Sequence, residues 1–402
     1  MKKKILIAAC SLEIGGIERS LVGLLDVFDY ARYDVDVLLF SRKGELLPFV
    51  SEKCTVLPEI PQCATLLQPI KTVLLQGHVG LAAARLAARR SVSRHYKNPN
   101  GDPQIADGAI FALLQKYWDN SVRFMPSLPG EYDAAISFMW PHHYVAQKVR
   151  AHKKIAWVHT DYTIALMDRE KDAAVWTQFD RIAAVSDECG AAFLQVYPQF
   201  RERMITIENI LPQEFVRRSA EEFEPTEMQN AGYRLLSVGR LCYPKAYDRA
   251  VRVSRILKDR GLPFCWYVVG YGSDEAKLRA MIVELGVEDC FVLLGKKSNP
   301  YPYIRACDLF LQPSRYEGKA VTVREAQMLG RPVLITDFKT ARSQVREGFD
   351  AVIVPQDETA IADGIESLLR DDDRRRQLSE NTQTVDYSNA EQVEKIYRMI
   401  EE

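Results

Sequence analysis

Short apolar runs alternate along the chain with longer segments of helical periodicity. The first series of runs predicts strands at 4–9, 35–40, 54–57, 133–138, 154–158, 181–185 and 204–207. The second series predicts strands at 234–238, 264–269, 290–294, 308–312, 332–336 and 351–354. Runs this apolar are typical of parallel strands buried on both faces, and the helices between them indicate βαβ units. The pattern therefore predicts an α/β fold with two doubly wound, Rossmann-like domains.

A polar stretch at 210–230 separates the two series. It is rich in charge, contains prolines and lacks a sustained apolar period, which is typical of a domain junction. We expect an N-terminal domain over 1–212 and a C-terminal domain over 213–388. Residues 389–402 have the pattern of an amphipathic helix, and such a helix could pack back on the first domain.

Composition narrows the function only a little. The 402 residues include 53 Lys and Arg against 54 Asp and Glu, so no overall charge indicates nucleic acid or membrane as a partner. Eight cysteines form no C-x-x-C pair and several lie in apolar runs, which indicates a reducing, cytoplasmic location. The start MKKKILIAAC is explained better by a buried first strand than by a signal peptide. No run of about eighteen apolar residues predicts a membrane-spanning helix.

One region does not fit the alternation of strands and helices. Residues 60–130 are long for a single connection, and within them 81–97 carries five Arg or Lys and no acid. The Ala and Leu residues of this stretch favour a helix. Such a helix is either simply solvated or a surface that contacts anionic lipid or a phosphate-bearing acceptor.

Two glycines follow the first predicted strand. Gly15 and Gly16 lie between strand 4–9 and a helix expected to start near Ile17. Glycine lets a backbone approach a ligand closely, and the free N–H groups at a helix start attract anions. The dinucleotide fingerprint G-x-G-x-x-G is absent. A tight turn without a ligand is at least as good an explanation for the pair.

Cations follow the first strand of the second series. Strand 234–238 leads into Gly239, Arg240 and Lys245, and both types of cation suit phosphate oxygens. The carboxyl ends of parallel strands are where α/β proteins bind ligands. The next strand leads into a G-x-G that ends at Gly272, which indicates a sharp turn where a nucleotide could bind. The alternative is two solvated loop cations beside ordinary turns.

The segment SRYEGKAVTVREAQMLGRP carries two glutamates, Glu317 and Glu325, separated by seven residues. It follows strand 308–312, and we expect a helix over 320–329. That arrangement places the first carboxylate just before a helix N-terminus and the second inside the helix. Without a ligand, the two would be a helix-start acid favoured by the helix dipole and a surface residue.

The backbone between these glutamates is a candidate anion site. We expect the amides of Lys319, Ala320 and Val321 to be unpaired donors near the helix start, suited to a diphosphate. Carboxylates on either side would accept hydrogen bonds from the hydroxyls of a sugar and of a ribose. A nucleoside diphosphate sugar presents its groups in this order.

A histidine and an acidic pair complete the candidates. His159 follows the apolar strand 154–158, where it faces a ligand or is an ordinary structural histidine. Asp34-x-Asp36 is superficially like the metal-binding D-x-D of some sugar transferases, but it lies at the start of a strand. No spacing of His, Cys and Glu is typical of a zinc site, so we expect no metal.

The order of these elements resembles that of retaining glycosyltransferase family 4, which has the GT-B fold. The matching segments are Gly15-Gly16 with Glu18, WVHTDY, AVSD, SVGRL with Lys245, VGYG, and YEG…REAQMLGRPVLIT. The likeness covers most of the chain and is densest over 234–337. The segment 298–326 is similar, more narrowly, to bacterial capsular, exopolysaccharide and cell-wall glycan enzymes. The resemblance implies two Rossmann-like domains that face each other across a cleft.

The resemblance also implies roles for matched positions. Glu317 would bind hydroxyls of the donor sugar, and Glu325 would bind the ribose. Arg240 and Lys245 would neutralise the diphosphate leaving group, so that no metal is required. The sugar would move with retained configuration. The donor would be a nucleotide diphosphate sugar, with a UDP-sugar as the first expectation, and it would act as a co-substrate rather than a cofactor.

In the first domain, the resemblance implies that Gly16 brings its backbone to the diphosphate and that His159 lies near the sugar. The implied acceptor is a glycan or a lipid-linked glycan, with no nucleic acid involved. The chain departs from the family at Lys319, where Phe is common, and at Ala246, where Gly is usual. An alternative function is a non-catalytic GT-B module that binds a nucleotide sugar or stabilises a partner transferase. A nucleotide-sugar epimerase and a dinucleotide oxidoreductase fit the motifs less well.

Overall fold

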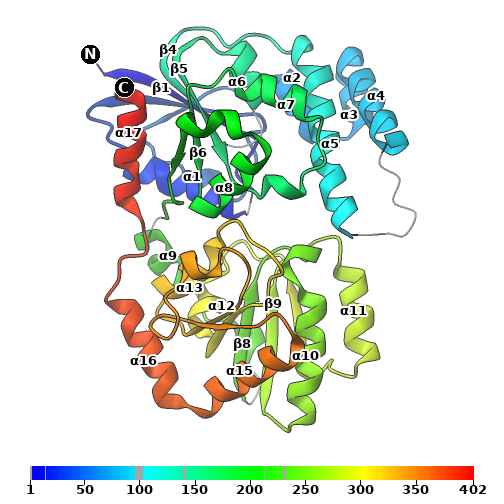
Figure 1. Cartoon of the computed structure of the whole chain (residues 1–402), viewed down its shortest axis with the longest axis vertical. Coiled ribbons are helices and arrows are strands. Elements are labelled where there is room, and N and C mark those ends of the chain that lie inside the picture. The colour runs from blue at the N-terminus through cyan, green and yellow to red at the C-terminus, as the bar shows by residue number, and fades with distance from the viewer. Residues whose placement is uncertain (1, 14, 96–102, 139–141, 212, 230–231) are drawn as a thin grey trace. The chain divides into compact units, whose positions relative to one another are not determined.

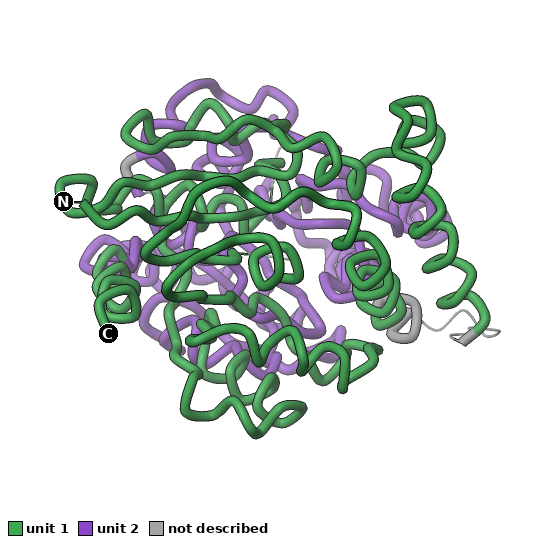
Figure 2. The backbone as a smooth tube through the Cα atoms, turned by 90° about the horizontal axis from the view of Figure 1, so that it is seen from above, with its two compact units in different colours: residues 1–210, 390–402 green, residues 211–389 purple. Residues whose placement is uncertain are grey.

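The computed structural model describes residues 2–13, 15–95, 103–138, 142–211, 213–229 and 232–402 (Figure 1). Contacts divide the chain into two compact units, shown in two colours in Figure 2. Unit 1 comprises residues 1–210 and 390–402, and unit 2 comprises residues 211–389. The division falls two residues before the expected boundary, and the terminal segment belongs to the first unit.

The described residues of unit 1 form a parallel sheet of seven strands in the order β3-β2-β1-β4-β5-β6-β7. The strands are β1 (Lys3–Ala9), β2 (Tyr33–Leu39), β3 (Thr55–Val56), β4 (Tyr132–Ser137), β5 (Ala151–Val158), β6 (Arg181–Ala184) and β7 (Met204–Thr206). Each coincides with an apolar run of the first series, which is the pattern expected of strands covered on both faces.

Helices flank this sheet. The α-helices are α1 (Gly16–Val27), α2 (Pro61–Ala64), α3 (Ile70–Leu75), α4 (Val79–His95), α5 (Pro103–Ser121), α6 (His142–Lys148), α7 (Arg169–Trp176), α8 (Asp187–Val196) and α17 (Val393–Glu401). The short 3-10 helices are η1 (Leu47–Phe49), η2 (Thr65–Leu67), η3 (Val122–Phe124), η4 (Tyr162–Ile164), η5 (Pro198–Arg203) and η8 (Ala390–Gln392).

The C-terminal helix α17 packs on unit 1 through aromatic side chains. The ring of Tyr397 stacks on Tyr33 with centroids 4.9 Å apart and meets Phe28 edge-on. Its hydroxyl accepts a hydrogen bond of 2.6 Å from the amide of Asp29. The apolar face of this amphipathic helix therefore completes the core of the first unit.

Unit 2 has a parallel sheet of six strands among its described residues, in the order β10-β9-β8-β11-β12-β13. The strands are β8 (Tyr233–Val238), β9 (Phe264–Val269), β10 (Phe291–Gly295), β11 (Leu309–Gln312), β12 (Val333–Thr336) and β13 (Val352–Val354). The α-helices are α9 (Gln213–Ala220), α10 (Tyr247–Asp259), α11 (Glu275–Glu284), α12 (Tyr301–Ala306), α13 (Val321–Met328), α14 (Ala341–Gln344), α15 (Glu358–Arg370) and α16 (Asp372–Gln383). Two 3-10 helices, η6 (Thr226–Met228) and η7 (Tyr243–Lys245), complete the unit.

The strand orders locate a ligand-binding edge in each unit. In unit 1 the order reverses between β1 and β4, and in unit 2 it reverses between β8 and β11. In open α/β sheets, ligands bind outside the carboxyl ends of the strands at such a switch point. In unit 2, this is the place where β8 leads into Gly239 and Lys245, and where β11 leads into Glu317.

Helices fill the long connection that did not fit the strand pattern. Helices α4 and α5 pack against each other, and α4 includes 81–95 of the stretch predicted to be a basic helix, whose last two residues lie outside the described part of the chain. Arg85 corrects the expectation of a wholly solvated or lipid-facing basic surface. Its side chain is buried, and its guanidinium donates to the carbonyl of Thr65 and, at 2.6 Å, to that of Gln68. A buried cation needs hydrogen-bond partners. By bonding these two carbonyls, Arg85 links α4 to the end of the segment that contains η2.

Among the residues that the structure describes, no helix combines the length and the apolar character that crossing a membrane demands.

Candidate active site

A fixed glutamate lies at the switch point of unit 2. One carboxylate oxygen of Glu317, Oε1, accepts hydrogen bonds from Lys245 Nζ at 2.6 Å, Ser314 Oγ at 2.6 Å and Gln312 Nε2 at 2.9 Å. Gln312 is the last residue of β11 and is almost fully buried. Three donors on one oxygen hold the carboxylate in a single orientation.

The second oxygen of Glu317 is left for another donor. Oε2 makes no hydrogen bond within the described part of the chain, and the side chain is 12% exposed. The backbone behind it is also tied down, because Thr340 donates to the carbonyl of Glu317 at 3.1 Å. The site therefore presents one preoriented, solvent-reachable acceptor, which suits the hydroxyl groups of a sugar.

A second ion pair joins the two loops that carry Lys245 and Glu317. The guanidinium of Arg315 donates to both oxygens of Asp248 at 2.8 and 2.7 Å, and to the carbonyl of Tyr243 at 2.8 Å. Its own amide donates to the carbonyl of Pro244. We call this arrangement the Arg315–Asp248 clamp. The fork of an arginine on a carboxylate fixes geometry as well as charge, so the clamp sets the distance between the loops.

The charges of the clamp are stable near neutral pH. Burial opposes ionisation of Asp248, but its hydrogen bonds and charge attraction with Arg315 and Arg252 outweigh burial and lower its pKa to about 2. The carboxylate therefore stays charged over the range in which most enzymes work.

Glycines allow the strand ends to approach this site. A Cβ atom built on Gly239 would lie 2.9 Å from the hydroxyl of Tyr247 and 3.2 Å from Cε of Lys245. A Cβ atom on Gly272 would collide with the backbone carbonyl of Leu241. Both glycines predicted from sequence are thus required by close packing at the edge where a ligand is expected.

Ala246 stores backbone strain beside Lys245. It is fully buried and adopts the left-handed conformation, with φ of 57° and ψ of 35°, between η7 and α10. Non-glycine residues pay a conformational penalty in this region. The departure from the usual glycine, which looked minor in the sequence, therefore carries an energetic cost at the site.

The other predicted cations differ in their surroundings. Arg240 is exposed and makes no hydrogen bond or ion pair with the part of the chain that is described, so an anion can approach it. Lys319 donates to the carbonyl of Ser343 at 3.4 Å. The first of these cations is available to a diphosphate, whereas the second already has a backbone partner.

The prediction of three unpaired backbone donors at the start of this helix is wrong for one of them. Helix α13 begins at Val321, so Lys319 and Ala320 precede it, and the amide of Ala320 donates to Oε1 of Gln344 at 3.3 Å. Ala320 is therefore not the unpaired donor that the sequence suggested. Its amide is already bonded to the side chain of a glutamine that lies 24 residues later in the chain.

Glu325 lies within α13 as expected, but its side chain does not face solvent. It is fully buried and accepts a hydrogen bond of 3.1 Å from the hydroxyl of Tyr301 on α12. The alternative of a surface helix residue is wrong. A contact between this carboxylate and a ribose stays a prediction, and it requires the side chains that cover Glu325 to move.

In unit 1, Gly15 and Gly16 lie at the start of α1, where the sequence placed them. Gly15 is the N-cap in an extended conformation, and Gly16 is the first helical residue. A Cβ atom on Gly15 would collide with the end of the Glu18 side chain, which lies over the glycine. A ligand at this helix start would therefore meet a carboxylate as well as backbone donors.

His159 follows β5 in unit 1 and is held as a neutral ring. Its Nε2 lies 2.7 Å from the carbonyl oxygen of Phe138, so Nε2 carries the proton and donates it. Nδ1 is then an acceptor, and it is buried without a partner among the described residues. Burial lowers the pKa of His159 to about 4, although the bond to Phe138 acts in the opposite direction. The residue is suited to accept a hydrogen bond, not to carry charge.

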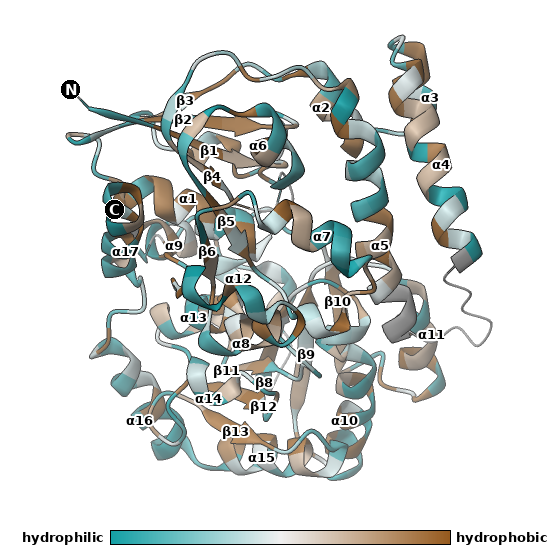
Figure 3. Cartoon of the chain, turned by 45° about the horizontal axis from the view of Figure 1, so that its top comes forward, coloured by the Kyte–Doolittle hydropathy of each residue, from teal (hydrophilic) through white to brown (hydrophobic). Residues whose placement is uncertain are grey.

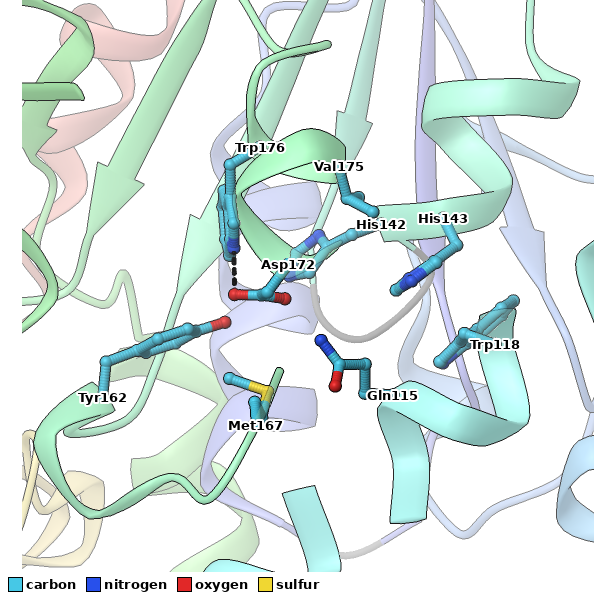
Figure 4. Close-up of a pocket in the computed structure, with 9 residues that line it drawn as sticks. All are labelled: Gln115, Trp118, His142, His143, Tyr162, Met167, Asp172, Val175 and Trp176. Carbon is cyan, nitrogen blue, oxygen red and sulfur yellow. Dashed lines mark hydrogen bonds between the residues drawn. The ribbon is translucent and has the colours of Figure 1, made fainter. Parts of the chain in front are cut away.

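A small cavity lies among polar and aromatic side chains of unit 1 (Figure 4). Asp172 accepts hydrogen bonds from Trp176 Nε1 at 2.9 Å and from the hydroxyl of Tyr197 at 2.7 Å. The volume of about 20 Å³ is room for about one water. The lining residues are Gln115, Trp118, His142, His143, Tyr162, Met167, Asp172, Val175 and Trp176. The cavity is too small to hold a sugar or a nucleotide.

The acidic pair at the start of β2 has a structural environment. Asp36 is buried, accepts a hydrogen bond of 2.9 Å from the hydroxyl of Tyr132, and lies 3.3 Å from Lys4 Nζ. Across the described ranges, no three His, Cys, Asp or Glu side chains gather in the way a metal ion would need.

Comparison with known proteins agrees with the geometry of unit 2. Residues 219–385, which lie within this unit, match the family model for group 1 glycosyl transferases. The chain is 33% identical over 131 residues to the amylovoran biosynthesis glycosyltransferase AmsK of Erwinia amylovora, covering 31% of this chain and 32% of that protein. It is 29% identical over 153 residues to an N-acetylgalactosaminyltransferase of Campylobacter jejuni, covering 37% of this chain and 41% of that protein. The matches therefore span less than half of each relative.

Solved structures extend the likeness to the whole fold. HepE of Anabaena, in complex with UDP-glucose, has a TM-score of 0.70 at 16% identity, covering 98% of this chain and all of that one. TarM of S. aureus, in a complex that includes UDP, has a TM-score of 0.67 at 15% identity and covers both chains completely. The fold is that of GT-B glycosyltransferases. The likeness in sequence to the family model for group 1 glycosyl transferases is thus confined to residues 219–385 of unit 2.

Proposed function

We propose that the protein is a retaining glycosyltransferase, which moves a sugar from a UDP-sugar to a glycan or lipid-linked acceptor. The reaction would serve the synthesis of a bacterial surface polysaccharide or cell-wall glycan, in the cytoplasm. The observation that carries the proposal is the carboxylate of Glu317, fixed through one oxygen and open at the other, at the switch point of unit 2.

The donor's charge and its sugar would be bound by different groups. Glu317 Oε2 would accept hydrogen bonds from sugar hydroxyls, while Lys245 keeps two further ammonium protons for phosphate oxygens after bonding Oε1. Arg240, which has no partner in the described chain, would take the remaining phosphate charge. These roles need neither a metal ion nor a cofactor. The roles implied for Gly16 and His159 in unit 1 stay predictions.

In the proposed reaction, the acceptor hydroxyl attacks the anomeric carbon on the same face of the sugar from which the leaving group departs. The bond between that carbon and the phosphate oxygen breaks, and its electron pair leaves with the nucleoside diphosphate. The acceptor's proton passes to the departing phosphate. Fixed cations stabilise the charge that develops on the diphosphate, because they are already oriented before the reaction.

Relatives support the choice of substrates. The structural neighbour HepE was solved with UDP-glucose, and the neighbour WaaG is described as a glycosyltransferase of lipopolysaccharide biosynthesis. The Campylobacter relative acts, by its name, on a diphospho-undecaprenol carrier. These properties belong to those proteins, and they make a UDP-sugar and a lipid-linked glycan the first substrates to test.

The test is a screen of UDP-, GDP- and ADP-sugars by thermal shift, followed by turnover of any sugar that raises the melting temperature. Glu317→Gln, Arg240→Ala and Lys245→Ala should each reduce transfer, and activity should persist in EDTA. Glu284→Gln changes an exposed glutamate of α11 and serves as the matched control. Transfer at the wild-type rate in all three site variants would refute the assignment. UDP binding without turnover would instead favour a non-catalytic module.

A further inference from the structure

Exposed apolar side chains cluster where α3 turns into α4. Leu75 is 80% exposed and Val79 is 63% exposed, and Leu74 and Phe124 are also exposed. The ring of Phe124 belongs to the same surface, since a Cβ atom on Gly80 would lie only 3.0 Å from it. We call Leu74, Leu75, Val79, Leu86 and Phe124 the elbow surface. Figure 3 shows α3 and α4 as outer helices of unit 1, with brown positions over α3 and the start of α4.

The elbow has its own small core, so these outward residues are not needed to hold it together. Val73, Leu81 and Ala82 are buried against one another, with Ile70 beside them, as a cluster separate from the main core of unit 1. Beside this cluster on α4, Val79 and Leu86 are both exposed. They are seven positions apart and therefore lie on one side of α4. The apolar surface of this part of α4 therefore extends beyond the buried cluster to side chains that nothing in the described chain covers.

The chain segment that forms the elbow carries charge of a single sign. The sequence contains no Asp or Glu from 60 to 101. Lys71, Arg90 and Arg94 are exposed, and the guanidinium of Arg123 lies 4.7 Å from the ring of Phe124. Arg85 does not contribute, because it is buried and bonded to backbone carbonyls. Leucines bordered by cations are the combination that binds the surface of an anionic bilayer.

We propose that the elbow surface docks on anionic phospholipid, with the apolar side chains entering the interface and the cations facing the headgroups. A second copy of the chain is a poorer occupant, because a twofold contact would bring these like charges together. The proposal does not depend on the transferase assignment, since binding is measured without substrate. It also adds the apolar side chains of the turn to the expected contact through the arginines of 81–97.

The test is flotation of the full chain with vesicles of phosphatidylcholine containing about 30 mol% phosphatidylglycerol, compared with pure phosphatidylcholine. Leu75→Asp and Val79→Asp should each weaken binding at least about tenfold, because each removes an apolar group from the interface and adds a repelled charge. Val79 is the first residue of α4, where an acid suits the helix dipole. Val283→Asp, at a 65% exposed valine of α11 in unit 2, is the matched control and should bind like the wild type.

The charge contribution is tested separately. Arg90→Gln with Arg94→Gln should weaken binding roughly tenfold or more and reduce its dependence on salt. Arg150→Gln with Arg201→Gln changes two other exposed arginines of unit 1 and should leave binding unchanged. The proposal is overturned by wild-type protein that does not float with anionic vesicles, by equal binding to pure phosphatidylcholine, or by elbow variants that bind normally. A change in oligomeric state caused by Leu75→Asp, without vesicle binding in the wild type, would assign the surface to a second copy instead.

Discussion

The two units have the same order of strands around their switch points but differ in the side chains that follow the carboxyl ends of those strands. In unit 2, charged side chains are placed there and held by ion pairs, Lys245 with Glu317 and Arg315 with Asp248. In unit 1, His159 follows the strand end as a neutral ring whose pKa is lowered by burial. A shared architecture therefore supports two different kinds of chemistry.

The difference has a physical cause. Carboxylates and cations can be kept charged near a protein surface when each has a geometrically fixed partner, as in the clamp of unit 2. A buried imidazole without a counter-ion instead becomes neutral, because burial penalises its charged form. The strand ends of unit 2 suit a charged ligand such as a nucleoside diphosphate. The surroundings of His159 in unit 1 suit neutral hydroxyl groups.

The largest effect should come from Lys245→Met. It removes a cation from the proposed leaving group and releases Oε1 of Glu317, so we expect transfer to fall roughly 100- to 1,000-fold. Steady-state kinetics with the identified donor measure this loss. Lys297→Met is the matched control, because it breaks a comparable ion pair of 2.8 Å with Glu227 in the same unit. Equal losses in both variants would show that the effect is one of stability.

Arg315→Met should show whether the Arg315–Asp248 clamp positions the loops for activity or only stabilises the fold. Loss of the clamp leaves Asp248 without its bidentate partner, so we expect roughly 2 kcal/mol less stability and about a 10- to 100-fold drop in kcat/KM. Denaturant unfolding and kinetics measure the two effects. Arg234→Met breaks a similar two-pronged pair with Asp308, at the opposite ends of the strands. It should cost similar stability while activity is retained.

The neutral histidines of unit 1 predict acid sensitivity. Burial, and then the nearby charges of His143 and His159, lower the pKa of His142 to about 3. The unfolded chain therefore binds a proton below about pH 6.5 that the folded chain does not, so stability is present above that pH and is lost as the pH falls towards 3. Because the residue as a whole is only partly buried, we expect a loss of about 2 kcal/mol between pH 6.5 and 4.

Chemical unfolding at a series of pH values measures this slope. His142→Asn should reduce the slope, whereas His152→Asn at an exposed histidine of β5 should leave it unchanged. A slope that does not respond to His142→Asn would mean that this ring is not held neutral in the folded protein.

The smallest effect concerns the strain beside Lys245. Ala246→Gly should stabilise the protein by about 1 kcal/mol, because glycine adopts the left-handed conformation without the Cβ penalty. Ala250→Gly, four residues later inside α10, should destabilise it by a similar amount. Thermal unfolding of the two variants checks the predicted opposite signs.

Much of the fold could be predicted because it depends on local pattern. Each apolar run marked a strand of one sheet or the other, and the expected helix over 320–329 is α13. Lys245 and Glu317 were both expected at strand ends, where α/β proteins bind ligands, but the ion pair between them was not predicted. These predictions succeeded because hydrophobic periodicity and strand order act over short distances along the chain.

Side-chain partners far apart in sequence could not be predicted in the same way. Arg315 and Asp248 are 67 positions apart, and Gln344 occupies the Ala320 amide from a different helix. The buried state of Arg85 was also missed, since an arginine in a basic helix gives no local sign of the carbonyls that it meets. The spacing of charges predicts which side chains could contact a ligand, but tertiary packing decides which of them are available.

The most direct test of the central claim is a crystal structure of the protein with UDP. We predict that the diphosphate lies within hydrogen-bond distance of Arg240 and Lys245, at the carboxyl ends of β8 and β11, with Oε2 of Glu317 facing the position of the missing sugar. UDP bound at another part of the chain, with this edge unchanged, would contradict the account.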